Sequence, residues 1–189
     1  MIIIGLTGTN GSGKDELSKY LETKGFAHFS ARKDILEKEL MKKGLALSRE
    51  NMISIANEMR AKDIGALSKK LFDMAIAKGQ NAIIESLRSP AEIDAVRAYA
   101  KEKKISFVFW GIDANPRTRY DRTMKRKAST DPQMTFEQFV LLEQQETQSK
   151  NPKDSNIKKA LDMASEVFFN NGTLESLYKE IELELRQYL

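Results

Sequence analysis

The sequence contains no cysteine and a single histidine, His28, among its 189 residues. Disulfides, thiolate nucleophiles and cysteine-based zinc sites are therefore excluded, and one histidine cannot form a histidine metal cluster alone. Any metal ion that this chain binds is expected to be a hard cation on oxygen ligands.

Long apolar runs are also missing. The apolar start, Met1 to Leu6, is too short for a signal peptide and has no basic region before it. No segment approaches the roughly 18 consecutive apolar residues of a membrane span. We therefore expect a cytoplasmic protein with no membrane partner.

The chain also lacks a large excess of charge of either sign. The chain has 31 Lys and Arg against 27 Asp and Glu, for a formal net charge of +4, and the basic residues are spread along it. So small an excess favours small anionic ligands and argues against a polymeric nucleic acid as partner. The hydrophobic fraction of 41% is enough for the core of one domain, either a monomer or a small homo-oligomer.

Short apolar runs alternate with longer segments of helical period, which is typical of βαβ units on a parallel sheet. The predicted strands are Ile2–Thr7, Ala27–Ser30, Asn81–Glu85, Ile105–Ile112 and Val167–Asn170. We expect a three-layer α/β fold with about five parallel strands and helices on both faces.

Capping signals predict where helices begin. They are Ser89-Pro90-Ala91-Glu92, Asn115-Pro116 and Thr135-Phe136-Glu137-Gln138. Between the second and third predicted strands lie roughly 50 residues of helical period. So long an insertion, at about 31–79, is expected to cover a binding site.

The most informative stretch is Gly8-Thr9-Asn10-Gly11-Ser12-Gly13-Lys14, which follows an apolar strand and precedes a helical pattern. This is the GxxxxGK motif in the context that it requires. Its glycines let successive N–H groups point inward, the helix start adds a positive end, and the lysine supplies a mobile charge. These residues predict a cradle for the β-phosphate of a nucleoside triphosphate.

One residue departs from this motif. The position after Lys14 normally holds a Ser or Thr that ligates Mg²⁺, and here it holds Asp15. A carboxylate facing the phosphates is repelled unless a cation lies between them. Asp15 therefore either holds Mg²⁺ or its water, or points away from the site, and the sequence leaves both alternatives open.

Over nearly its whole length the chain resembles the small P-loop kinases of the nucleoside monophosphate kinase group, and also dephospho-CoA kinase. The resemblance is carried by the phosphate loop, Ile83-Ile84-Glu85-Ser86-Leu87-Arg88, the arginines from Arg117 to Arg126, and Asn170-Asn171-Gly172-Thr173-Leu174. It implies a P-loop NTPase fold, ATP and Mg²⁺, and an adenine base lying against Asn171 or Gly172.

The activity implied by this resemblance is transfer of the γ-phosphoryl group of ATP to a small phosphate acceptor. The leading hypothesis for the acceptor is a nucleoside or deoxynucleoside monophosphate. Dephospho-CoA is the alternative acceptor, and a slow ATP-binding regulatory switch is the alternative from another class of protein.

Glu85 ends a strand that should lie beside the first strand, and ligands of open α/β sheets bind at the carboxyl ends of strands. Its carboxylate is suited to orient Mg²⁺-bound water or to accept a proton from an acceptor hydroxyl. Arg88, three residues later, is suited to hold an acceptor phosphate. The alternative for both is an exposed salt bridge in a loop.

Arg119, Arg122 and Arg126 recur at helical spacing and share one stripe of a predicted helix. That helix runs into a polar break, which predicts a lid at about 117–134. We expect Arg122 and Arg126 to close on the phosphates and exclude water. The alternative is that these arginines only form a solvated helix face.

The start of the helical insertion holds Ser30, Arg32 and Asp34, where the resemblance implies a residue that binds the acceptor. Arg60 lies on an otherwise apolar helix face, where an unpaired charge is costly. Its partner is expected to be either a structural carboxylate or the phosphate of the acceptor. His28, beside a short strand, is interpreted as structural.

Overall fold

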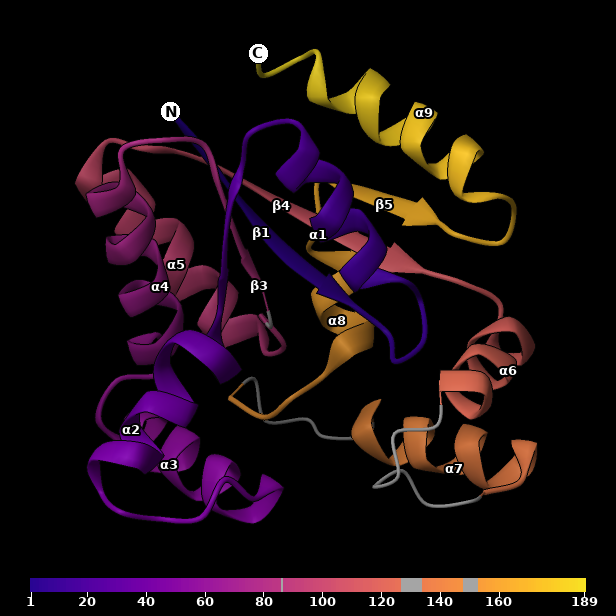
Figure 1. Cartoon of the computed structure of the whole chain (residues 1–189), viewed down its shortest axis with the longest axis horizontal. Coiled ribbons are helices and arrows are strands. Elements are labelled where there is room, and N and C mark those ends of the chain that lie inside the picture. Colours follow the sequence, from indigo (N-terminus) through magenta and orange to yellow (C-terminus); the bar gives the residue numbers. More distant parts are fainter. Residues whose placement is uncertain (86, 127–133, 148–152) are drawn as a thin grey trace.

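The computed structural model describes residues 1–85, 87–126, 134–147 and 153–189. Its centre is a five-stranded parallel sheet in the order β2-β3-β1-β4-β5 (Figure 1). The strands are β1 (Ile2–Gly8), β2 (Ala27–Ser30), β3 (Ala82–Glu85), β4 (Ser106–Asp113) and β5 (Glu166–Phe169). The α/β fold expected from the sequence is confirmed.

Helices cover both faces of this sheet, which gives three layers (Figure 1). One face carries α1 (Lys14–Thr23) and α9 (Leu174–Leu185), and the other carries α4 (Ala66–Lys78), α5 (Pro90–Lys103) and α8 (Ile157–Asp162). The other helical elements are η1 (Ala31–Leu36), which is a π-helix, α2 (Glu37–Lys42), α3 (Arg49–Lys62), α6 (Pro116–Arg126) and α7 (Phe136–Thr147). No helix in these described ranges is both long and apolar enough to cross a membrane.

The central strand β1 explains why both faces need cover. Ile2, Ile4 and Leu6 belong to a core cluster with α1 and α9, whereas Ile3 belongs to a second cluster with α4 and α5. Successive side chains of a strand point to opposite faces, so a strand that is apolar throughout is buried from both sides. Every residue of β1 is buried.

Local signals located the elements well. The predicted strand Ala27–Ser30 is matched residue for residue, and the ends of the other four strands differ by one residue. α6 begins at Pro116, as its cap predicts, and Ser89 accepts a hydrogen bond of 3.2 Å from the Glu92 backbone N–H at the start of α5. Between β2 and β3, where the helical insertion is predicted, the chain forms η1, α2, α3 and α4.

The strand order determines what meets at the carboxyl end of the sheet. Leu6 of β1 pairs with Glu85 of β3, and Gly8 pairs with Ile112 of β4. The loop after β1 therefore lies between the ends of β3 and β4. The insertion flanks this end on one side and α6 with α7 on the other (Figure 1).

Candidate active site at the phosphate loop

The loop between β1 and α1 is a tight turn closed by its own hydrogen bonds. The backbone N–H of Ser12 donates to the Thr9 carbonyl at 3.3 Å, and the Ser12 hydroxyl donates to the same oxygen at 2.8 Å. Gly11 and Gly13 have φ angles of +77° and +103°, a region that side chains with a Cβ rarely adopt. Helix α1 starts directly after Gly13, so its N-terminus faces the loop.

Three neighbouring segments press on the glycines of this loop. A Cβ atom at Gly8 would lie 2.4 Å from the Ile112 carbonyl oxygen, and one at Gly11 would lie 2.5 Å from that of Arg119. A Cβ atom at Gly13 would lie 2.4 Å from the side-chain nitrogen of Asn170. The loop is therefore packed against β4, α6 and the segment after β5.

Lys14 lies against the backbone of the loop. Its ammonium donates to the carbonyl oxygens of Gly8 at 2.9 Å and Thr9 at 3.2 Å. A cation held by the loop itself is in position to meet a phosphate that binds there.

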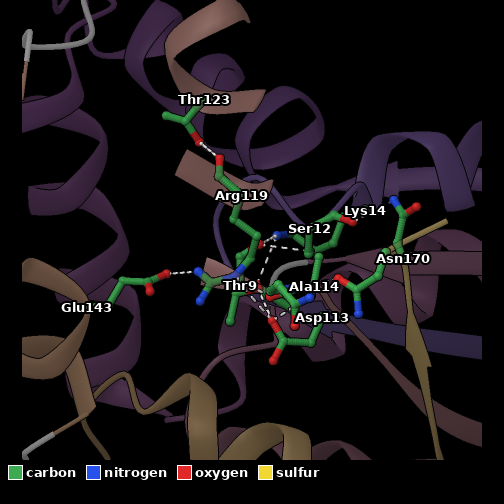
Figure 2. Close-up of polar contacts among 12 residues, drawn as sticks. Thr9, Ser12, Lys14, Asp113, Ala114, Arg119, Thr123, Glu143 and Asn170 are labelled. Carbon is green, nitrogen blue, oxygen red and sulfur yellow. Dashed lines mark hydrogen bonds and ion pairs between the residues drawn. The ribbon is translucent and has the colours of Figure 1, made fainter. Parts of the chain in front are cut away.

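Asp113, at the end of β4, connects the loop to α6 (Figure 2). One of its carboxylate oxygens accepts hydrogen bonds from the Thr9 hydroxyl at 2.5 Å and from the backbone N–H of Ala114 at 2.8 Å. The same oxygen lies 3.4 Å from Nε of Arg119, and the Arg119 guanidinium also contacts Glu143 of α7. Arg119 is only 5% exposed and joins β4 to α7 by pairing with both carboxylates.

Asn170 holds the loop from the β5 side. Its buried amide nitrogen donates to the Ser12 carbonyl at 2.8 Å, and its amide oxygen accepts from Nη2 of Arg122 at 3.4 Å. The next two residues of the predicted adenine site, Asn171 and Gly172, are exposed, and the Asn171 side chain accepts a hydrogen bond from the backbone N–H of Asn115. Their contact with a base stays a prediction.

A pocket of about 230 Å³ opens beside the loop. It is lined by Asn10, Gly11, Gly13, Lys14, Asp15, Glu16, Arg122 and Thr123. Within the described part of the chain, the buried Nη1 atom of Arg122 has no hydrogen-bond partner. Because the side chains of Lys14 and Arg122 line it, the pocket fits an anionic group such as a phosphate.

A larger hollow of about 360 Å³ lies elsewhere, between β5 and α9. Its lining includes Glu166, Glu180 and Glu184 and, among the residues that the structure describes, no cationic side chain. This hollow repels a polyphosphate, so the smaller pocket is the candidate site.

Asp15 is exposed on the lining of the candidate pocket, and either alternative for its role is compatible with that position. The described residues contain no group of three or more acidic or histidine side chains that could hold a metal ion. A single carboxylate beside a phosphate loop, as Asp15 is, fits Mg²⁺, which usually keeps several waters and takes one or two carboxylates together with substrate phosphates.

Glu85 ends β3 beside His28 and within electrostatic range of Lys14. Its carboxylate lies 3.4 Å from Nε2 of His28, whose other ring nitrogen lies 2.8 Å from the Glu22 carboxylate. Burial disfavours the charged carboxylate, but His28, Ser30 and Lys14 outweigh it and lower the pKa of Glu85. Glu85 is therefore an ionised carboxylate beside the phosphate loop.

Glu92, at the start of α5, is a carboxylate on which the charges of Arg60 and Arg88 both act. Glu92 is 2% exposed, and its carboxylate accepts a hydrogen bond of 3.3 Å from the backbone N–H of Arg88. Burial raises the pKa of Glu92, and the charges of Arg60 and Arg88 oppose that rise. Both alternatives for the partner of Arg60, a structural carboxylate and the phosphate of the acceptor, stay predictions.

The other residues predicted to bind the acceptor lie in different surroundings. Asp34 accepts a hydrogen bond of 2.8 Å from the backbone N–H of Ser30 and so shapes the start of the insertion. Arg32 is not brought to the pocket, because its side chain is 69% exposed and pairs with Glu37. The side chain of Arg126 and residues 127–133 of the predicted lid lie outside the described residues.

Three residues that contact the phosphate loop or its neighbours are not among the predicted site residues. Asp113 and Thr123 carry no motif, and only the fold brings them to the loop. His28, for which a structural role is expected, contacts Glu85, and that role stays a prediction. The register of β2 against β3, which pairs Ser30 with Glu85, was the missing information.

Comparison with known proteins gives this geometry a context. Residues 4–149 match a family model described as an AAA domain. A UPF0200 protein of Thermococcus kodakarensis is 32% identical over 187 residues, which cover 96% of this chain and 95% of that protein.

Solved structures with the same fold include two kinases. Shikimate kinase from Aquifex aeolicus is 15% identical with a TM-score of 0.53, over 98% of this chain and 96% of that one. A gluconokinase from Sinorhizobium meliloti is 15% identical with a TM-score of 0.54, over 97% of this chain and 91% of that one. This likeness shows the shared P-loop fold.

Proposed function

The chain belongs to the UPF0200 family and to the AAA domain family, and from this premise we propose that it is an ATP-dependent kinase of a small molecule. The observation that carries the proposal is the pocket at the phosphate loop. Lys14 and Arg122 both line it, and Nη1 of Arg122 is a buried atom without a hydrogen-bond partner among the described residues. Cations that converge on a phosphate loop suit phosphoryl transfer, which depends on alignment and charge stabilisation.

Each residue has a distinct task in this proposal. ATP supplies the γ-phosphoryl group, and Mg²⁺ neutralises charge on its phosphates. The loop N–H groups and Lys14 hold the polyphosphate, while Arg122, fixed by Asn170, stabilises the charge of the transferring group. Arg126 belongs to the same proposal through its place on the α6 stripe.

The acceptor that we propose is a nucleoside or deoxynucleoside monophosphate. The charges of Arg60, on α3, and of Arg88, after β3, both act on the Glu92 carboxylate, and two arginines are suited to a phosphate monoester. With this acceptor, a phosphate oxygen attacks the γ-phosphorus while the bond to ADP breaks.

A hydroxyl acceptor is the second candidate, and the ionised state of Glu85 favours it. A hydroxyl must lose its proton as its oxygen bonds to phosphorus, and the carboxylate of Glu85 is suited to take that proton. Glu85 would then act as a general base, and with a phosphate acceptor it would orient Mg²⁺-bound water.

The test is ADP formation from ATP and Mg²⁺ with a panel of nucleoside monophosphates, dephospho-CoA and small hydroxy acids. We expect one monophosphate class to raise turnover well above the rate without acceptor. Turnover raised only by dephospho-CoA or a hydroxy acid would replace the proposed acceptor. If no acceptor raises turnover although ATP binds, a slow regulatory switch replaces the kinase.

A pair of variants on α6 tests the role of Arg122. Arg122→Ala should lower kcat by about 100-fold or more, the usual effect of removing one preorganised donor to a transition-state charge. Lys125→Ala is the control, because Lys125 carries the same charge on the same helix and is exposed. Equal losses in both variants would contradict a specific role for Arg122.

A further inference from the structure

We propose that Asp113 is a positioning residue of the phosphate loop. Its carboxylate fixes Thr9, and through Thr9 it fixes the shape of the loop that receives the nucleotide phosphates. The role rests on the nucleotide site of the proposed function, and it concerns a carboxylate that the proposed function does not use.

The carbonyl oxygen of Thr9 is the acceptor that closes the loop. It accepts hydrogen bonds from the Ser12 backbone N–H at 3.3 Å, from the Ser12 hydroxyl at 2.8 Å and from the Lys14 ammonium at 3.2 Å. One peptide group thus orients both the turn that carries the inward N–H groups and the lysine of the motif. A rotation of this carbonyl would disturb all three bonds at once.

The side chain of Thr9 is held from outside the loop, by Asp113 (Figure 2). The Thr9 hydroxyl donates to a carboxylate oxygen of Asp113 at 2.5 Å, and the same oxygen accepts from the backbone N–H of Ala114 at 2.8 Å. Hydrogen bonds to a carboxylate are stronger than those between neutral groups. This bond is therefore suited to fix the orientation of Thr9.

Asp113 is itself held by the sheet. It ends β4, and its carbonyl oxygen accepts a hydrogen bond of 2.8 Å from the backbone N–H of Asn170. The pairing of β1 with β4 ends at Gly8 and Ile112, and Thr9 and Asp113 follow directly. A group on a strand holds its partner more precisely than a group on a loop does, so Asp113 is a fixed point for the start of the phosphate loop.

The charge of Asp113 is offset by Arg119. A carboxylate beside a phosphate loop would repel a polyphosphate, but Nε of Arg119 lies 3.4 Å from the Asp113 oxygen that Thr9 contacts. Arg119 is buried and is also held by Glu143 of α7. Asp113 thus serves Thr9 as a hydrogen-bond acceptor, a role that needs its oxygen and not its negative charge.

Two substitutions at Asp113 separate the oxygen from the charge. We measure the Kd of ADP and of inorganic diphosphate, each with Mg²⁺, by calorimetry, which needs no phosphate acceptor. Asp113→Ala should weaken both probes by about tenfold, the scale of one lost hydrogen bond. Asp113→Asn keeps an oxygen for the Thr9 hydroxyl and the Ala114 N–H, and it should bind both probes at least as tightly as the parent.

Three results at this position would overturn the role. They are equal affinities for the parent and Asp113→Ala, an Asp113→Asn variant as weak as Asp113→Ala, and a loss confined to ADP. The last would contradict the role because diphosphate has only the phosphate groups that the loop receives.

A double variant tests whether Asp113 acts through Thr9. Thr9→Val removes the hydroxyl and should by itself weaken both probes by about tenfold. If the two side chains act through one hydrogen bond, adding Thr9→Val to Asp113→Ala should weaken binding by less than about twofold more. A further tenfold loss would overturn the role, because the two side chains would then act independently.

Glu143→Ala is the control that separates affinity from stability. It takes a carboxylate from buried Arg119 but leaves the bond between Thr9 and Asp113 in place. It should therefore lower the midpoint of urea unfolding and keep both Kd values within about twofold of the parent. An Asp113→Ala variant that behaves in the same way would show that Asp113 is merely structural.

These outcomes are distinct from those of the kinase test. Weaker binding by Asp113→Ala, restored in Asp113→Asn, would support the role even if no acceptor is ever phosphorylated, because binding alone is measured. Turnover with an acceptor would not rescue the role if Asp113→Ala binds both probes as the parent does. A parent that binds neither probe would overturn the nucleotide site and this role together.

Discussion

Gly13 offers a direct measure of how firmly the phosphate loop is held. Its φ angle is +103°, and a Cβ atom there would lie 2.4 Å from the amide nitrogen of Asn170. Gly13→Ala therefore carries two costs. The left-handed backbone costs an alanine about 1–2 kcal/mol, and loss of the buried hydrogen bond from Asn170 to Ser12 adds about 1–3 kcal/mol.

Gly25 is a matched control within the same chain. Its φ angle is +86°, and nothing lies within 4 Å of a Cβ atom built on it. Gly25→Ala should therefore show only the backbone cost of about 1–2 kcal/mol. The expected loss for Gly13→Ala is about 2–5 kcal/mol, the sum of both terms.

Urea unfolding at constant pH compares the two variants, and thermal unfolding gives a second reading. For a chain of 189 residues, each kcal/mol lowers the Tm by about 2–4 °C. Only Gly13→Ala should also weaken ADP binding. Equal destabilisation by the two substitutions would refute the claim that Asn170 holds the loop. The claim would also fail if Asn170→Ala cost as much unfolding free energy in the Gly13→Ala variant as it does in the parent.

Three further predictions concern side chains. Glu143→Ala should cost about 2 kcal/mol in urea unfolding, because buried Arg119 loses one of its two carboxylates, whereas Asp121→Ala, which breaks an exposed pair, should cost under about 0.5 kcal/mol. Asp15→Ser should change the Mg²⁺ dependence of ADP binding, and an unchanged dependence would exclude Asp15 as a metal ligand. Burial raises the pKa of Glu92, so the native state binds its proton more tightly than the unfolded chain does. The stability contribution of Glu92 is therefore present below the ordinary pKa of a glutamate and is lost as the pH rises through the raised pKa of the folded state. Over this pH range, the unfolding free energy of Glu92→Gln should rise relative to that of the parent. A difference that stays constant with pH would contradict this.

The elements of the fold could be predicted because their signals are local. A run such as Ile2–Leu6 has to be buried from both faces, and a proline after a capping residue starts a helix wherever that helix packs. The phosphate loop is local as well, since one short stretch contains the strand end, the glycines and the lysine. Shifts of one residue at strand ends reflect pairing, which depends on neighbouring strands.

The rest of the site depends on tertiary placement. Arg119 and Arg122 share one helical stripe, yet the first is buried between carboxylates and the second lines the pocket. One part of this helical stripe is buried and the next part lines the pocket. The helical period alone does not predict where the change occurs. Likewise, Arg32 was assigned by its position in the chain, but a nearby carboxylate, Glu37, holds it at the surface.

The contacts of α6 sharpen the prediction of a lid at about 117–134. The first turns of this segment are anchored, because the Arg119 carbonyl oxygen lies within 2.5 Å of a Cβ atom built on Gly11 and the Arg119 side chain is tied to Asp113. Arg122 lies one turn further along the same helix and is held by Asn170. A residue fixed at both its backbone and its side chain contributes by preorganisation. Arg122 should therefore stabilise a bound polyphosphate without closure of α6, and any closing movement has to come from other segments.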